Sequence, residues 1–219
     1  MRIDLTGKVA AFLGGSPALN DRLAGCLIAS GAQVTQVIEG QVDVVVISPG
    51  RLTEKPFMDT DSDDWDSSLS NNVEQSVYAM QTAARHMIGH RRSGRIIILS
   101  SVAALKSQTN MSVAGTSLAA LQVIAQMAAV DLGPYGITVN IIAMGVTDEG
   151  WIPRSLNVGS LTEVQRYIPL TRVGTIDDIG DVCCFLASDQ AQYITGAIIP
   201  VDGGYTLTKA GAGTPPKRE

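Results

Sequence analysis

Short, uninterrupted runs of apolar residues, separated by stretches with helical periodicity, constrain this chain most strongly. The runs at 9–13 and 44–47 are apolar throughout, and further candidate strands cover residues 95–99, 137–142 and 197–201. A strand that is apolar along its whole length must be covered on both faces, as strands of parallel sheets are. The sequence therefore predicts an α/β fold with a single doubly wound parallel sheet.

The intervening stretches carry apolar residues at helical spacing. We expect helices over residues 19–28, 65–87 (one long helix or a pair), 114–132 and 177–188, with a short helix at 161–167. Asp177 and Asp178 suit the positive N-terminal end of the fourth of these helices. No internal repeat or second domain is evident, so we expect one domain over residues 1–207, followed by a polar tail over 208–219.

Composition excludes several classes of partner. The chain is 45% hydrophobic and 17% charged, with a net charge of −5. Its basic run at residues 90–95 is too short for a nucleic-acid groove and is interpreted as a solvated helix end. The three cysteines have neither metal-ligand nor disulfide spacing, which predicts no metal site.

The N-terminus and the lengths of the apolar stretches predict the cellular compartment. The N-terminus does not resemble a signal peptide, because it leads directly into the first strand. We find no apolar stretch of the roughly 20 residues that a membrane-spanning helix needs. We therefore expect no membrane association, and the cytoplasm is the predicted location.

Several ordered sequence blocks resemble the short-chain dehydrogenase/reductase family over nearly the whole chain. The closing blocks are residues 168–174, 177–179, 185–189, 193–196 and 201–204, and the segment 134–140 is similar to the family as well. The order and spacing of so many blocks make a chance match improbable. The resemblance implies a Rossmann-like fold and a site for NAD(P).

The resemblance places the family's four catalytic residues on this sequence. The asparagine falls on Asn72, and the serine on Ser101 at the end of an apolar run. The family's tyrosine and lysine occur in a Tyr-x-x-Ser-Lys-Ala-Ala-Leu pattern, which corresponds here to residues 114–121. Ala114 therefore stands in place of the tyrosine and Leu118 in place of the lysine.

The chemistry that the family implies uses both missing side chains. When a carbonyl receives a hydride, the alkoxide that forms must receive a proton. In the family the tyrosine supplies this proton, while the lysine lowers the tyrosine's pKa and binds the cofactor ribose. A positioned acid contributes roughly 10²- to 10⁴-fold to the rate. We therefore expect Ser101 and Asn72 to be remnants of a catalytic site in a chain that does not transfer hydride by itself.

The expected cofactor turn also departs from the family pattern. The family's Thr-Gly-x-x-x-Gly-x-Gly lets the backbone approach a pyrophosphate at a helix N-terminus. Here Gly14 is kept, but Ala18 and Asn20 replace the second and third glycines. Glu39 is the nearest acidic candidate for an adenosine ribose. We expect no cofactor to bind this chain, with NAD(P) held instead by an active partner subunit.

A deletion affects the same region. The family has a helix, a strand and another helix between its second and fourth strands, whereas only residues 39–42 separate the runs at 34–38 and 43–47 here. Parallel neighbours need a crossover of about a dozen residues, and four extended residues reach only ~14 Å. We expect the fold to be truncated between the second and fourth family strands. The second strand would be short, displaced or lost, and the wall for adenine would be absent.

Two regions that form subunit interfaces in the family suggest that this chain assembles into an oligomer. In the family, the helix that begins near Trp65 and the helix over 114–132 usually pack against a partner subunit, and the last strand and its preceding helix form a second interface. Both regions are complete here. The leading hypothesis is an inactive pseudoenzyme that assembles in a dimer or tetramer, with itself or with an intact paralogue. A hydroxyacyl-CoA dehydrogenase is the analogy within the family.

Two alternatives remain open. The chain could be an enzyme with altered chemistry, using Ser101, Asn72 and Lys106 in the old substrate cleft. It could also be a module that binds a nucleotide without reacting. Loss of activity in Ser101→Ala would favour the first alternative, and binding of NAD(H) or NADP(H) without turnover would favour the second.

Overall fold

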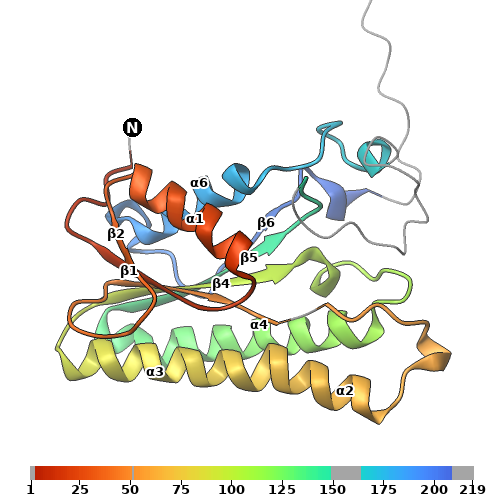
Figure 1. Cartoon of the computed structure of the whole chain (residues 1–219), viewed down its shortest axis with the longest axis horizontal. Coiled ribbons are helices and arrows are strands. Elements are labelled where there is room, and N and C mark those ends of the chain that lie inside the picture. Colours follow the sequence, from red (N-terminus) through yellow and green to blue (C-terminus); the bar gives the residue numbers. More distant parts are fainter. Residues whose placement is uncertain (1–2, 51, 149–163, 209–219) are drawn as a thin grey trace, which may run out of the picture.

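A computed structural model of the chain describes residues 3–50, 52–148 and 164–208, and the predicted parallel α/β fold is confirmed (Figure 1). All strand pairs are parallel, in the order β2-β1-β3-β4-β5-β6. The strands are β1 (Val9–Gly14), β2 (Gln33–Thr35), β3 (Val44–Ser48), β4 (Gly94–Ser101), β5 (Ile137–Met144) and β6 (Ile198–Val201). Five of them lie on the apolar runs that the sequence predicts.

Helices cover both faces of the sheet, as Figure 1 shows. On one face lie α1 (Pro17–Ala29) and α6 (Ile176–Ala187); on the other lie α2 (Ser62–Ser68), α3 (Gln75–Gly89) and α4 (Ser112–Leu132). A π-helical turn, η2 (Leu69–Glu74), joins α2 to α3. Of the two possibilities predicted for 65–87, a single long helix or a pair, the structure has the pair, linked by a wider turn.

Neighbouring residues of one strand supply the two cores. In β3, Val44 and Val46 pack in the cluster with α1 and α6, whereas Val45 and Ile47 pack in the cluster with α3 and α4. Successive side chains of a strand point to opposite faces, so an entirely apolar strand serves both cores. This explains why the apolar runs are continuous.

Side-chain caps fix where two helices begin. Ser16 caps α1 by accepting a hydrogen bond from the Leu19 amide, and Pro17 occupies the first helical position, where no amide is needed. At α6, Thr175 and Asp178 form a capping box. The acidic start that the sequence predicts for α6 is therefore confirmed.

Short 3-10 turns connect the main elements. They are η1 (Phe57–Asp59), η3 (Val102–Ala104), η4 (Gly133–Tyr135), η6 (Gln165–Tyr167), η7 (Asp189–Ala191) and η8 (Tyr205–Leu207). The helix expected at 161–167 is described only from residue 164 onward, where it is η6. The predicted tail lies outside the described residues from 209 onward.

The second family strand is short but present. β2 pairs with β1 through only three residues, Val9↔Gln33 to Ala11↔Thr35. Because β2 ends at Thr35, the eight residues 36–43 are free to reach β3, a span of up to about 28 Å when extended. Within the described part of the chain, no strand lies beyond β2, so the sheet ends where the family's third strand would begin.

The expectation about long apolar stretches was wrong for one helix. The stretch Ser112–Tyr135, which contains α4, is long and apolar enough to cross a membrane by length and composition alone. In the fold, α4 packs against β4 and β5, and its buried side chains join the core. Packing on the sheet accounts for this apolar character.

Candidate functional site

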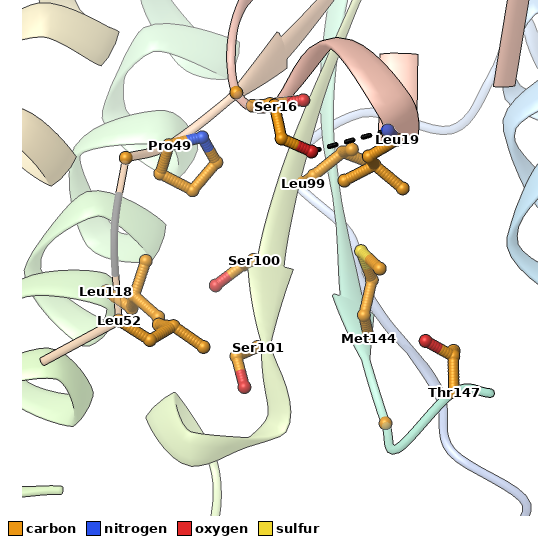
Figure 2. A pocket seen from close by; sticks show the side chains of 14 residues that line it. Ser16, Leu19, Pro49, Leu52, Leu99, Ser100, Ser101, Leu118, Met144 and Thr147 are labelled. Carbon is orange, nitrogen blue, oxygen red and sulfur yellow. Dashed lines mark hydrogen bonds between the residues drawn. The ribbon is translucent and has the colours of Figure 1, made fainter. Parts of the chain in front are cut away.

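A crevice opens at the carboxyl ends of the central strands. Its cavity of about 290 Å³ is bordered by the residues that follow β1 and β3 and by the ends of β4 and β5 (Figure 2). Because β1 connects to β2 on one side and lies beside β3 on the other, the chain changes direction between β1 and β3. Ligands of open α/β sheets bind at such a switch point.

Two glycines allow the turn after β1 to pass close to β3. Gly14 and Gly15 both have positive φ, at 72° and 71°. A Cβ atom on Gly14 would lie 2.5 Å from the Ser48 carbonyl oxygen, and one on Gly15 would lie 2.3 Å from the Ser48 Cβ. Only glycine fits such contacts. The turn is therefore held against the end of β3, at the edge of the crevice.

The two residues that replace the family's other glycines do not line the crevice. Asn20 turns inward: its Nδ2 donates to the Gly14 carbonyl at 2.7 Å, and its Oδ1 accepts from Ser48 Oγ at 3.1 Å. Ala18 lies in the first turn of α1, outside the cavity lining. The substitutions thus brace the turn and leave the crevice open.

Two serines end β4 at the floor of the crevice. Ser100 Oγ accepts a hydrogen bond from Gln122 Nε2 at 3.1 Å. Ser101 Oγ accepts one from the Ala103 amide at 3.2 Å, and within the described residues its hydroxyl proton has no hydrogen-bond acceptor. Ser101 is therefore placed, as the sequence predicts, where it can donate to a ligand.

Ala114 and Leu118 occupy the start of α4, one turn apart. Ala114 is fully buried and packs with Ala103, Met111 and Leu52. Leu118 lines the crevice, and Figure 2 shows it beside Leu52 in this view. The places of the family's tyrosine and lysine are thus an apolar wall, to which the loop after β3 adds Leu52.

Asn72 is not in the crevice. It lies in the η2 turn, fully buried, and its Nδ2 donates to Ser68 Oγ at 3.2 Å and to Ser117 Oγ at 2.9 Å. Its Oδ1 has no hydrogen-bond partner. Asn72 therefore does not line the crevice with Ser101, and its bonds link α2 and the η2 turn to α4 instead.

The other sequence candidates lie elsewhere. Lys106 donates to the carbonyl oxygens of Tyr205 at 2.8 Å and Thr208 at 2.6 Å, which ties the η3 loop to the residues after β6. Glu39 is exposed in the connection from β2 to β3 and does not border the crevice. Neither residue contributes to the crevice.

The structure offers no metal-binding cluster in its described residues, where no three His, Cys, Asp or Glu side chains lie together suitably. Cys183 and Cys184 are buried in the core between α6 and the sheet. Burial raises the pKa of the Cys183 thiol well above its usual range, which keeps it protonated. The adjacent cysteines therefore pack as apolar side chains.

Sequence reasoning missed three residues of the crevice: Leu52, Met144 and Thr147. Each follows a central strand or ends one. Their position after the predicted strands could have identified them, because residues just beyond the carboxyl ends of parallel strands form the ligand crevice of this architecture.

Comparisons with known proteins agree with the fold. The family described as enoyl-(acyl carrier protein) reductase matches residues 28–206. The chain resembles structures of gluconate 5-dehydrogenase from Burkholderia cenocepacia J2315, solved with NADP and tartrate, and of a short-chain type dehydrogenase/reductase from Mycobacterium ulcerans. The first has a TM-score of 0.84 and 22% identity, and the match covers 95% of this chain and 98% of that chain. The second has a TM-score of 0.82 and 23% identity, and the match covers 93% of this chain and 91% of that chain. At these identities the likeness shows the fold.

Curated relatives are more similar in sequence. The chain is 35% identical to a 3-oxoacyl-(acyl-carrier-protein) reductase of Buchnera aphidicola, over 75% of this chain and 66% of the relative. It is 32% identical to L-rhamnose 1-dehydrogenase (NAD(P)(+)) of Azotobacter vinelandii, over 92% and 80%. It is 34% identical to cyclohexanol dehydrogenase of Rhodococcus sp., over 77% and 64%. The chain thus spans 64% to 80% of the length of these relatives.

These relatives contradict the leading sequence hypothesis. All three are named as oxidoreductases, and the chain shares their family, so the prediction of an inactive pseudoenzyme was wrong. That prediction treated the loss of two side chains as the loss of the whole site, whereas the crevice and Ser101 are retained. On its sequence blocks, its sheet and its relatives, the chain belongs to the short-chain dehydrogenase/reductase family.

Proposed function

We propose that this chain is an oxidoreductase that exchanges a hydride between a nicotinamide dinucleotide and a small alcohol or carbonyl compound. The observation that carries the proposal is the Ser101 hydroxyl, which lines the cavity at the carboxyl ends of the central strands. A hydroxyl at this place can donate to a carbonyl oxygen as negative charge develops on it. The family's oxidoreductases support the same assignment.

The crevice fits one half of a dinucleotide better than the other. The glycine turn and the start of α1 offer backbone amides at a helix N-terminus, which suits a phosphate. The polar Ser16 and Ser48 border the same side. By contrast, the sheet ends at the short β2, so the wall for an adenosine is reduced. The bound dinucleotide would supply or accept the hydride. Binding of a dinucleotide here differs from the sequence-based expectation that the chain binds no cofactor.

The apolar wall defines the class of substrate. Leu52, Leu99, Leu118 and Met144 border the cavity together with the serines of β4. Such a wall favours a substrate with an apolar body and one polar group that Ser101 can reach. No tyrosine hydroxyl is present at Ala114 to deliver a proton, so the proton comes from water in the open crevice. The rate then lies roughly 10²- to 10⁴-fold below that of a member with the complete site.

Oxidation of NADH and NADPH by the isolated chain tests the proposal, with short aliphatic and alicyclic ketones as substrates. We expect slow turnover that falls about 10²-fold in Ser101→Ala and is largely restored in Ser101→Thr, which keeps the hydroxyl. Ser107→Ala, in the exposed part of the η3 loop, is the matched control and should leave the rate unchanged. Equal rates in the wild type and Ser101→Ala would refute the role of Ser101.

We also propose that the chain assembles through α3 and α4, either with itself or with an intact relative. The two helices lie side by side on one face of the sheet (Figure 1). Their outer surface exposes large apolar side chains: Tyr78, Val123, Met127 and Val130. Large apolar side chains exposed on neighbouring helices favour an interface. Sedimentation equilibrium tests this, and a monomer at all concentrations, with no copurifying dehydrogenase, would refute it.

The cytoplasm remains the proposed location. The support is the family itself, because its members here are named as reductases and dehydrogenases of small molecules. The apolar helix α4, which alone in the described chain has the length and composition of a spanning segment, is accounted for by its packing on the sheet. Fractionation of cells into soluble and membrane material would test the location.

A further inference from the structure

The crevice is bordered by the central part of the sheet alone. Its described lining comes from the turn after β1 and the start of α1, the residues after β3, the ends of β4 and β5, and Leu118 of α4. Residues 33–43, which form β2 and its connection to β3, are all described, and none of them borders the cavity. The cavity of about 290 Å³ is small for a ligand site, since such sites occupy roughly 300–1,000 Å³. The crevice therefore suits a small ligand that stays beside the central strands.

The end of β2 has no acidic group that could bind an adenosine. In dinucleotide-binding sheets, an acidic side chain about 20 residues after the first glycine bonds the adenosine ribose. Val34, Thr35 and Gln36 lie at that distance from Gly14, and none of them is acidic. The Thr35 hydroxyl is used locally, because it accepts from the Val37 amide at 3.2 Å and donates to the Val37 carbonyl at 3.3 Å. The ribose of an adenosine therefore has no acidic partner at this strand end.

Glu39 does not replace the missing acid, because the chain after β2 runs toward the opposite end of the sheet. The Gly40 carbonyl accepts a hydrogen bond from His86 Nε2 at 2.9 Å. His86 lies in the last turn of α3, which leads to the amino end of β4. Ile38 and Val42 pack in the core cluster with α3 and α4. Glu39 is therefore held toward the amino ends of the strands, whereas the crevice opens at their carboxyl ends.

The start of α1 offers donors for one phosphate. Pro17 has no amide hydrogen, and the Leu19 amide is already bonded to Ser16 Oγ at 3.3 Å (Figure 2). The Asn20 amide donates to the Ser16 carbonyl at 3.1 Å. Within the described residues, the Ala18 amide alone in this first turn has no acceptor, and the Ser16 hydroxyl still has a proton to donate. These two donors suit a single phosphate at a helix N-terminus, not the pair in a dinucleotide.

We propose that the crevice takes a nicotinamide mononucleotide as its whole ligand, so that the adenosine half of a dinucleotide stays in solvent and adds no affinity. The inference rests on the proposed function in taking the crevice as the nicotinamide site. Ser16 and the start of α1 would hold the phosphate of the mononucleotide. The mononucleotide would supply or accept the hydride as a dinucleotide does, because the nicotinamide ring is the same in both.

Calorimetry on the full chain compares the binding of NADH, reduced nicotinamide mononucleotide, AMP and inorganic phosphate. We expect NADH and the mononucleotide to have dissociation constants within about threefold of each other, because a group left in solvent makes no contact. AMP carries the adenosine half alone, and it should bind no more tightly than inorganic phosphate. Binding of AMP at least about tenfold tighter than phosphate would overturn the inference.

Two variants test the two halves of the dinucleotide separately. Ser16→Gly removes the hydroxyl at the phosphate, while glycine still suits a helix N-cap. It should weaken NADH and the mononucleotide by the same factor, roughly three- to tenfold. Gln36→Ala, at the exposed end of β2, is the matched variant and should change the binding of neither. Selective loss of NADH binding in Gln36→Ala would contradict the inference, because it would place the adenosine against β2.

Turnover with a ketone separates this inference from the proposed function. If the wild type reduces a ketone with NADH but binds the mononucleotide at least about tenfold more weakly than NADH, the inference is wrong and the function stands. If NADH and the mononucleotide bind alike but neither supports turnover, the inference stands and the function is wrong. If the wild type binds neither of them, both are overturned.

Discussion

Asp43 at the amino end of the central strands differs in its hydrogen-bond partners from two polar residues at their carboxyl end, Ser101 and Thr147. At the amino end, Asp43 precedes β3 and accepts hydrogen bonds from the Val9 amide at 2.9 Å, Gln41 Nε2 at 2.8 Å and Arg92 at 3.1 Å. At the carboxyl end, Ser101 and Thr147 face a cavity, and the Thr147 hydroxyl is unpaired. Groups paired within the protein stabilise it, whereas groups that face a cavity are available to a ligand. We therefore expect Asp43 to contribute to stability, and Ser101 and Thr147 to be available for ligand binding.

Restoring the two missing side chains should have the largest effect. In Ala114→Tyr with Leu118→Lys, tyrosine can supply the proton and lysine can lower its pKa. The change is made with Leu52→Ala, because Leu52 packs on Ala114 and would obstruct a tyrosine. We expect turnover to rise roughly 10²- to 10⁴-fold, measured as NADPH oxidation with a ketone. Leu52→Ala alone is the control. An unchanged rate in the folded triple variant would show that substrate does not bind beside residue 114.

Disrupting the amino end should lower stability and leave ligand binding intact. In Asp43→Ala, the Val9 amide and Arg92 lose their acceptor, and we expect the free energy of unfolding to fall by about 2 kcal/mol. Urea titration measures this change. Asp21→Ala, on the exposed side of α1, is the control and should change stability by less than about 0.5 kcal/mol. A loss of nucleotide affinity in Asp43→Ala at temperatures where it is folded would break the division between the two ends.

The capping box of α6 gives the smallest predicted effect and a pH dependence. The Arg172 guanidinium, bonded to Asp178 at 2.7 and 2.8 Å, together with the Thr175 amide, holds the pKa of the Asp178 carboxyl well below its usual range. A lowered folded-state pKa stabilises the fold above the unfolded pKa of about 3.9, and this contribution is lost as pH falls through the folded value. Asp178→Ala should cost about 1 kcal/mol at pH 7.

The difference between Asp178→Ala and the wild type should remain constant from about pH 5 to pH 8 and shrink below about pH 4. Denaturation at a series of pH values measures it. A difference in unfolding free energy that grew in acid would mean that Asp178 is not stabilised as a carboxylate.

The sequence predicted most of the fold because the relevant signals are local. The mainly apolar sequences of β3, β4 and β5 follow from burial on both faces, and the acidic cap of α6 lies within one turn. The fate of β2 was left open, because it depends on where a three-residue strand ends. The positions of Ser101, Ala114 and Leu118 could be inferred from the resemblance to the family, whose sequence pattern aligns with this chain without a gap between them.

The remaining features depend on contacts between distant segments. The inward turn of Asn20 requires its bonds to Gly14 and Ser48, and the separation of Asn72 from the crevice requires Ser117 on another helix. An unpaired atom such as Thr147 Oγ1 is visible only when every neighbour is placed. The prediction of an inactive chain was wrong for the same reason. The substitutions at 18, 20, 114 and 118 were judged by residue type, without the packing that leaves the crevice open.

Transfer of deuterium from the nicotinamide to product tests the central claim most directly. The isolated chain is incubated with NADPH or NADH deuterated at carbon 4 and with a ketone, and the alcohol formed is analysed by mass spectrometry. The proposed function predicts alcohol that is heavier by one mass unit, with less of it from Ser101→Ala than from Ser101→Thr. Absence of labelled alcohol with either stereoisomer of the deuterated cofactors would contradict it.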